Sequence, residues 1–206
     1  MSAPRFITLE GLEGAGKTSR WVELKTYLER RGKTVCVTRE PGGTALGERL
    51  RELLLAADQD PMAPLTELLL MFAARSEHVT RVILPALAAG HWVLCDRYVD
   101  ASYAYQGGGR QLGVAPVAAL EALLPERARP DLTLLLDLPV EIGLARVNRR
   151  GSADRFEQET VAFHQRVRDA YLARARQSPQ RYRIIDATAR PDEVRNAIER
   201  AVEDLL

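Results

Sequence analysis

Residues 11 to 18 read Gly11-Leu12-Glu13-Gly14-Ala15-Gly16-Lys17-Thr18, between the apolar run Phe6-Ile7-Thr8-Leu9 and a segment with helical spacing. The pattern G-x-x-x-x-G-K-[ST] is typical of a P-loop, in which small residues let successive backbone N–H groups turn toward a phosphate chain. In that pattern Lys17 reaches the outer phosphates and Thr18 places its hydroxyl on Mg²⁺. A helix that begins near Lys17 also points its positive end at the anion. The segment therefore predicts a phosphate-binding site, and an ordinary glycine-rich turn between strand and helix is the alternative.

Short apolar runs recur along the chain and alternate with longer segments of helical spacing. The runs that we expect to be strands cover residues 6–10, 34–38, 92–95, 132–138 and 182–185. Strands that alternate with helices favour a parallel sheet, and the near-continuous apolarity of residues 132–136 suits a strand covered on both faces. We therefore predict an α/β fold of three layers, with a mainly parallel five-stranded sheet flanked by helices, in a single domain over residues 1–206.

The overall charge is close to neutral. The chain has 206 residues and a formal net charge of +1, from 29 Lys and Arg against 28 Asp and Glu. This balance gives no general basic field, so we expect no nucleic-acid partner and no membrane partner. The apolar stretches are far shorter than a membrane span, and the N-terminus lacks the layout of a secretory signal. We expect a soluble cytoplasmic protein in which any basic site is local.

Polar motifs follow two of the predicted strands. In parallel sheets ligands bind at the carboxyl ends of the strands, so these motifs are candidates for the site. Arg39-Glu40-Pro41-Gly42-Gly43-Thr44 follows the second run, and a turn with a solvated ion pair is its alternative explanation. Asp96-Arg97-Tyr98 follows the third run and matches a Walker B arrangement, in which the carboxylate holds Mg²⁺ directly or through water. A structural Asp that caps the next helix is the competing interpretation.

Two later segments are rich in polar or charged side chains. Residues 100–110 combine aromatic and hydrogen-bonding groups, which suits a flat polar ligand, although an ordinary polar loop also has this composition. Arginines then gather at Arg146, Arg149, Arg150 and Arg155. We predict a mobile lid over residues 146–158 that brings positive charge to a transferring phosphoryl group, and a solvated basic loop is the alternative.

In this order, the motifs closely resemble those of the bacterial thymidylate kinase family. The P-loop and residues 39–44, 96–98, 104–110 and 154–159 all match, and Ile185-Asp186-Ala187 also fits. The resemblance implies a P-loop kinase fold, a homodimer, and transfer of the γ-phosphoryl group of ATP to dTMP with Mg²⁺, giving dTDP. Composition and periodicity alone lead only to a P-loop nucleotide-binding protein.

The resemblance also implies roles for single residues. The ATP-binding residues would be Gly11, Glu13, Gly14, Ala15, Gly16, Lys17 and Thr18, and the metal-binding residues Thr18 and Asp96. The substrate-binding residues would be Glu13, Glu40, Arg51, Phe72, Arg75, Arg97, Ser102, Tyr105 and Gln106. The catalytic cations would be Lys17, Arg97, Arg150 and Arg155, with Arg146 and Arg149 behind them. Glu13 looks like the carboxylate that binds the sugar 3′-hydroxyl of dTMP, and Phe72 like the aromatic that stacks on thymine.

Two departures from the family pattern leave alternatives open. Phe72 and Arg75 are three residues apart where many relatives have four, so Met71 competes with Phe72 for the stacking position. Some relatives carry a basic residue directly after the P-loop carboxylate, where this chain has Gly14. The missing charge is then expected from the lid, with Arg150 and Arg155 as candidates.

Two other functions compete with this interpretation. The nearest is a P-loop kinase for another nucleoside monophosphate. The other is a regulatory P-loop switch that does not transfer phosphate to a small molecule. The switch is disfavoured because no Asn-Lys-x-Asp guanine motif occurs, since Asn148 and Asn196 are the only asparagines. A protein kinase is excluded because the chain has no His-Arg-Asp triplet.

Overall fold

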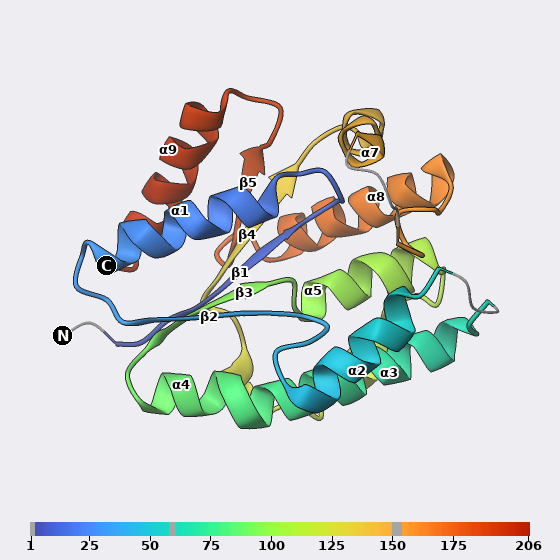
Figure 1. The fold of residues 1–206 in the computed structure, drawn as a ribbon, viewed down its shortest axis with the longest axis horizontal. Coiled ribbons are helices and arrows are strands. Elements are labelled where there is room, and N and C mark those ends of the chain that lie inside the picture. The colour runs from blue at the N-terminus through green and yellow to red at the C-terminus, as the bar shows by residue number, and fades with distance from the viewer. Residues whose placement is uncertain (1–2, 58–60, 150–153) are drawn as a thin grey trace.

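The centre of the molecule is a sheet of five parallel strands in the order β2-β3-β1-β4-β5 (Figure 1). The computed structural model describes residues 3–57, 61–149 and 154–206. Its strands are β1 (Phe6–Gly11), β2 (Val35–Arg39), β3 (Trp92–Asp96), β4 (Leu132–Asp137) and β5 (Tyr182–Asp186). Each strand end lies within one residue of the end predicted from the apolar runs. The predicted three-layer α/β fold is confirmed.

Strand β1 lies in the middle of the sheet, with β3 on one side and β4 on the other. Leu9 pairs with Asp96 of β3 and with Leu134 of β4. All of β1 is buried, because helices cover both faces of the sheet. Since the strands run in one direction, their carboxyl ends bring Gly11, Arg39 and Asp96 to the same edge.

Helices form a layer on each side of the sheet (Figure 1). On one side α1 (Lys17–Glu29) packs beside α9 (Pro191–Glu203), and on the other lie α2 (Ala45–Leu55), α3 (Pro64–His78) and α4 (Leu84–Ala88). Further helices are α5 (Val99–Ser102), α6 (Val114–Glu121), α7 (Val140–Asn148) and α8 (Val161–Gln177). Short segments with wider or tighter turns are η1 (Val79–Ile83), η2 (Tyr103–Gly109) and η3 (Glu126–Ala128). Segment η2 packs along α8, which places the 103–109 motif inside the fold.

Local signals explain where several helices begin. Thr44 and Thr160 cap α2 and α8, and each hydroxyl accepts a hydrogen bond from the backbone N–H three residues later. Pro64 and Pro191 lie in the first turns of α3 and α9, where a missing N–H costs no helical hydrogen bond. Helix α1 begins after Gly16, and no side chain caps its N-terminus. An uncapped N-terminus suits a helix that binds an anion there.

Two clusters of buried apolar side chains hold the layers together. The larger joins β1 and β4 to α1, α8 and α9, and the second joins β3 to α3 and η1. Within the described residues, none of the helices combines the length and the apolar character that crossing a bilayer requires.

Candidate active site

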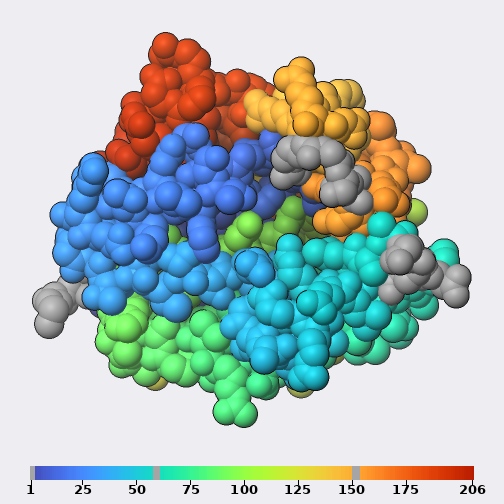
Figure 2. Space-filling view, in the orientation of Figure 1, coloured from blue at the N-terminus to red at the C-terminus, as the bar shows by residue number. Residues whose placement is uncertain are grey.

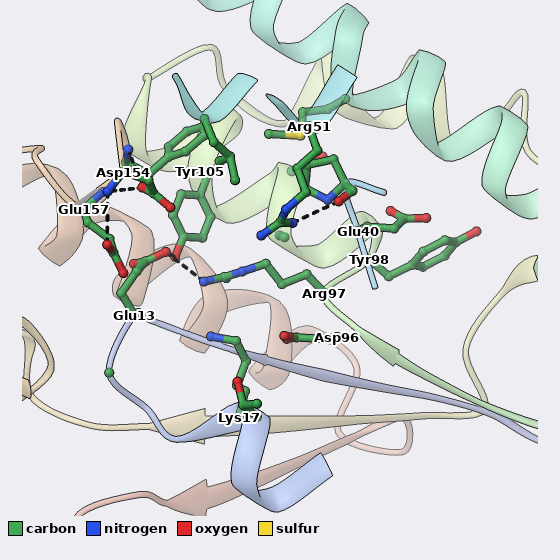
Figure 3. Close-up of a pocket in the computed structure, with 18 of the residues that line it drawn as sticks. Glu13, Lys17, Glu40, Arg51, Asp96, Arg97, Tyr98, Tyr105, Asp154 and Glu157 are labelled. Carbon is green, nitrogen blue, oxygen red and sulfur yellow. Dashed lines mark hydrogen bonds and ion pairs between the residues drawn. The ribbon is translucent and has the colours of Figure 1, made fainter. Parts of the chain in front are cut away.

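A cavity of about 560 Å³ lies at the carboxyl ends of β1, β2 and β3. In doubly wound sheets ligands bind at this edge, and the volume suits a small-molecule ligand. The P-loop, the segments that follow β2 and β3, helix α3 and residues 154–157 all contribute to the wall. Their side chains converge on the cavity in Figure 3, and the surface is hollowed between α1 and α2 in Figure 2.

Most of the residues predicted from the sequence meet in this cavity. Those on its wall are Glu13, Gly14, Gly16, Lys17, Thr18, Glu40, Arg51, Arg75, Asp96, Arg97, Ser102, Tyr105 and Gln106. The wall also contains residues that the sequence placed second or did not single out, namely Met71, Tyr98, Arg146, Asp154, Phe156 and Glu157. Of the described residues with predicted roles, Gly11, Ala15, Phe72, Arg149 and Arg155 lie off the wall.

The shape of the P-loop depends on its glycines. Gly14 and Gly16 have φ angles of 74° and 83°, which L side chains rarely adopt. Gly14 also packs against α7, and a Cβ atom there would lie 2.3 Å from the carbonyl oxygen of Gly143. Gly11 and Ala15 lie off the cavity wall, and their role in ATP binding stays a prediction.

Lys17, Thr18 and Asp96 share one part of the wall. Lys17 Nζ donates to the carbonyl oxygens of Gly11 and Leu12 at 3.1 and 3.0 Å, and burial lowers the pKa of Lys17 to about 8. The Oδ1 atom of Asp96 is buried and has no hydrogen-bond partner among the described residues. Mg²⁺ is usually held by one or two carboxylates together with phosphate oxygens, so Thr18 and Asp96 fit this ion beside a phosphate chain. In the described part of the chain, no group of three His, Cys, Asp or Glu is arranged to hold a metal.

The side chain of Glu13 points from the P-loop toward Arg97 and Tyr105 (Figure 3). Its Oε1 accepts hydrogen bonds from Arg97 Nη2 at 2.8 Å and from the Tyr105 hydroxyl at 2.6 Å. Its Oε2 is buried without a hydrogen-bond partner in the described residues, and His164 Nδ1 is 3.7 Å away. Burial raises the pKa of Glu13, but Arg97 and Lys17 more than offset this effect, so the pKa lies below its ordinary value. Glu13 therefore offers an acceptor oxygen to a ligand hydroxyl.

A buried network behind Arg97 was not predicted from the sequence. Arg97 has a φ angle of 64°, and its Nη1 donates to the Gly11 carbonyl at 2.9 Å and to the Tyr171 hydroxyl at 3.3 Å. The Tyr171 hydroxyl donates to Glu10 Oε2 at 2.7 Å, and the Tyr98 N–H donates to Glu10 Oε1 at 2.7 Å. Burial, followed by nearby negative charge, raises the pKa of Glu10 to about 8. The sequence signal for this network is a glutamate inside an apolar strand.

Arg75 is fixed on the opposite wall by three partners. Its Nε donates to Glu40 Oε2 at 2.7 Å, its Nη1 to the Ser102 hydroxyl at 3.0 Å and its Nη2 to the Tyr98 carbonyl at 3.0 Å. The side chains of Arg75 and Glu40 are each 3% exposed. Glu40 thus holds Arg75, and the arginine is in place before a ligand binds.

His78 extends this arrangement away from the cavity. Its Nδ1 is 2.8 Å from Glu40 Oε1 and its Nε2 is 2.6 Å from the Thr38 hydroxyl. In the neutral imidazole, Nδ1–H donates to the carboxylate, which only accepts, and Nε2 accepts from Thr38. Gly43 leaves room for the ring, since a Cβ atom there would lie 2.6 Å from His78 Cδ2. Nothing in the local sequence singles out His78, because Thr38 and Glu40 approach it only through the tertiary fold.

The structure places Met71, not Phe72, on the cavity wall. Phe72 is 6% exposed and packs in the second core cluster with Leu68, one turn earlier. Met71 and Arg75 are four residues apart and share one face of α3, so they turn toward the cavity together. Of the two candidates for the stacking position, Met71 is therefore the side chain that faces the cavity.

Two other predicted residues are held by their neighbours at the wall. Arg51 Nη1 donates to the Pro41 carbonyl at 2.9 Å, which keeps its guanidinium near the end of β2. Gln106 is 1% exposed, and its Nε2 donates to Glu67 Oε1 at 2.8 Å.

The arginines of the predicted lid have different positions. Arg150 lies outside the described residues. Arg155 points away from the cavity, because its Nε donates to the Leu54 carbonyl at 2.9 Å and its Nη1 is 2.8 Å from Glu67 Oε2. Arg146 reaches the wall, and its Nη1 is 3.2 Å from the carbonyl oxygen of Gly14. Of the described lid arginines, Arg146 is therefore the one beside the P-loop.

Comparison with known proteins agrees with this geometry. The family model described as thymidylate kinase matches residues 9–198. The chain belongs to the thymidylate kinase family. The thymidylate kinase of Alcanivorax borkumensis is 56% identical over 201 residues, which cover 98% of this chain and 97% of that protein. The thymidylate kinase of Pseudomonas entomophila is 58% identical, with 98% and 94% covered.

A solved structure is also similar to this chain. The crystal structure of thymidylate kinase from Ehrlichia chaffeensis superposes with a TM-score of 0.79 at 31% identity, and the match covers 98% of this chain and 99% of that one. The predicted family, its enzyme class and its fold are therefore confirmed. A regulatory P-loop switch is not favoured.

Proposed function

We propose that the chain transfers the γ-phosphoryl group of ATP to dTMP and gives dTDP, with Mg²⁺ bound at Thr18 and Asp96. The observation that carries the proposal is a single cavity that joins a P-loop to a second set of fixed polar side chains around Arg75. A switch needs only the P-loop half of this cavity. A kinase needs both halves, because donor and acceptor must meet in line.

On the donor side, the P-loop backbone and Lys17 hold the phosphate chain of ATP. Bound Mg²⁺ would neutralise charge on the phosphate oxygens and orient them. Arg97 is fixed by Glu13 and by the Gly11 carbonyl, so its charge is already directed to the region between the two halves. Because phosphoryl transfer depends on positioning and charge neutralisation more than on a strong base, these cations carry the catalysis.

On the acceptor side, Glu13 Oε2 accepts the sugar 3′-hydroxyl of dTMP. Its lack of a hydrogen-bond partner in the described residues supports this role. Arg75 binds the acceptor between base and phosphate, and Met71 packs against the base. Further residues that we propose to contact dTMP are Glu40, Arg51, Ser102, Tyr105 and Gln106.

Arg146 is the cation that we propose at the lid side of the phosphates, since the described part of the lid brings it to the P-loop. The catalytic roles of Arg150 and Arg155 stay predictions. For Arg155 such a role requires that it leave Glu67 and the Leu54 carbonyl.

A steady-state assay tests the function and the cation together. With ATP and Mg²⁺, we expect dTMP to be phosphorylated far faster than dUMP, dCMP, AMP or GMP. Arg146→Ala should slow turnover by roughly 100-fold, as is typical for loss of a preorganised group that stabilises transition-state charge. Arg176→Ala is the matched control, because Arg176 is exposed on α8 and lies off the cavity wall. Folded protein that makes no dTDP would refute the function, and unchanged turnover of Arg146→Ala would refute only the role of Arg146.

We also propose a homodimer that forms through α2 and α3. These helices pack together and carry exposed leucines, with Leu46 43%, Leu65 52% and Leu69 49% exposed. Exposed apolar surface on adjacent elements is typical of an interface. Light scattering should give the mass of a dimer, and Leu69→Glu should give a monomer. A monomeric parent chain would contradict this proposal. The cytoplasmic location and the single-domain organisation stay predictions.

A further inference from the structure

Glu67 is a buried carboxylate in the first turn of α3, next to the acceptor half of the cavity. It is 0% exposed. Gln106 Nε2 donates to its Oε1 at 2.8 Å, and Arg155 Nη1 lies 2.8 Å from its Oε2. Arg110 Nε lies 3.3 and 3.2 Å from the two oxygens. Three donors from two different segments, η2 with its C-cap and the segment after the lid, therefore meet on one side chain that is off the cavity wall.

This contact decides how the Gln106 amide is oriented. A carboxylate accepts hydrogen bonds and donates none, so the end of Gln106 that faces Glu67 has to be the NH₂ group. The guanidinium groups of Arg110 and Arg155 contact the same carboxylate through charge-assisted hydrogen bonds. The carbonyl Oε1 of Gln106 is therefore the end left for a ligand, and Gln106 lies on the cavity wall.

We propose that Glu67 is a positioning residue that selects the base of the acceptor, because it makes Gln106 present an acceptor rather than a donor. This inference rests on the proposed contact between Gln106 and the base. A ring N–H flanked by two carbonyls, as in thymine and uracil, matches a carbonyl acceptor. The corresponding ring nitrogen of cytosine carries a lone pair, so two acceptors would face one another and leave a buried polar group unpaired.

The surroundings of Glu67 hold it rigidly. Arg110 also pairs with Glu159, and Arg155 also donates to the Leu54 carbonyl. The carboxylate is thus fixed between α2, α3, η2 and the segment after the lid. A partner that rotates freely could not impose one orientation on the Gln106 amide, whereas the fixed carboxylate of Glu67 can.

The test is the ratio of the dissociation constants of dTMP and dCMP, measured by calorimetry in Glu67→Gln. The amide at position 67 can donate as well as accept, so the side-chain amide of Gln106 can take either orientation. We expect dTMP to bind about tenfold more weakly and the preference for dTMP over dCMP to fall about tenfold, as expected for the loss of one hydrogen bond. We expect kcat at saturating dTMP to change less. Glu77→Gln is the control, because Glu77 lies on the same helix and pairs with the exposed Arg81.

A swap of the two side chains provides a second test. In Glu67→Gln combined with Gln106→Glu, the amide at 67 can donate to the carboxylate at 106. A carboxylate has only acceptor oxygens, so position 106 again presents an oxygen to the cavity. We expect this variant to regain the preference for dTMP. If Glu67→Gln is folded and keeps the parent preference, or if the folded swap variant lacks it, the inference is wrong.

Gln106→Leu separates the inference from the role on which it depends. If this variant binds dTMP as tightly as the parent chain, Gln106 does not contact the base and the proposed acceptor site is wrong at that position. If it binds dTMP weakly while Glu67→Gln keeps its preference, only the positioning role of Glu67 fails.

Discussion

Replacing Gly14 by alanine should destabilise the fold through two separate effects. With a φ angle of 74°, the new side chain costs about 1–2 kcal/mol of backbone strain. Its Cβ would also lie 2.3 Å from the oxygen and 2.9 Å from the carbon of the Gly143 carbonyl. These are backbone atoms of α7 and cannot rotate away, so we add about 1–3 kcal/mol for overpacking. The total is about 2–5 kcal/mol, or a fall of about 10 °C in Tm for a chain of this size.

Gly32→Ala is a matched control for Gly14→Ala. Gly32 has a φ angle of 73°, and a Cβ there meets nothing within 4 Å. Gly32→Ala should lower the free energy of unfolding only by the backbone strain of about 1–2 kcal/mol, which corresponds to a fall of about 4 °C in Tm. Calorimetry without nucleotide measures both variants. Equal Tm values for Gly14→Ala and Gly32→Ala would show that α7 moves to make room for the Cβ atom at no cost, and would refute the steric reasoning. A larger fall for Gly14→Ala would also explain why this chain has no basic side chain at that P-loop position.

Four further substitutions give distinct outcomes. Burial raises the pKa of Glu10 from 4.5 to about 8. Between these pH values Glu10 is protonated in the folded chain and ionised in the unfolded chain, so the stability that Glu10 contributes is lost as the pH rises through this range. Glu10→Gln should therefore flatten the pH dependence of Tm over that range, and an unchanged slope would contradict the assignment. Met71→Ala should raise KM for dTMP severalfold with little change in Tm. Phe72→Ala should instead lower the free energy of unfolding by about 3–5 kcal/mol. Steady-state kinetics measures the first effect and urea unfolding the second. Asp100 is 1% exposed and pairs with two arginines, so Asp100→Asn should cost about 3–5 kcal/mol in urea unfolding, and a loss below about 1 kcal/mol would contradict the burial argument.

The sheet was predictable because its signals are local. The apolar run that became β4 is buried on both faces, and the glycines of the P-loop fix a turn without help from distant residues. The carboxyl ends of β1, β2 and β3 had to meet, so the predicted convergence of the P-loop, Glu40 and Asp96 follows from strand direction alone. Met71 was also within reach of the sequence, since its spacing of four from Arg75 puts both on one helix face.

The missed and misplaced residues depend on contacts between distant segments. Arg155 belongs to an arginine-rich segment, but its partner Glu67 lies on α3, and no spacing rule connects the two. His78 and Glu10 likewise acquire their partners only when helices pack on the sheet. Composition shows that such groups exist, whereas the tertiary fold decides which carboxylate receives which donor.

The central place of β1 has a consequence for the order in which the molecule opens. Amide groups of β1 are hydrogen-bonded on both sides and buried, so Ile7 and Leu9 should exchange their protons only through global unfolding. The P-loop follows directly from this strand. The acceptor half of the cavity depends instead on helices that pack on the sheet, since Arg51 lies on α2 and Arg75 lies on α3. The loop that would hold the phosphate chain is therefore tied directly to the strand that opens last, whereas the acceptor half is tied to that strand only through the packing of helices.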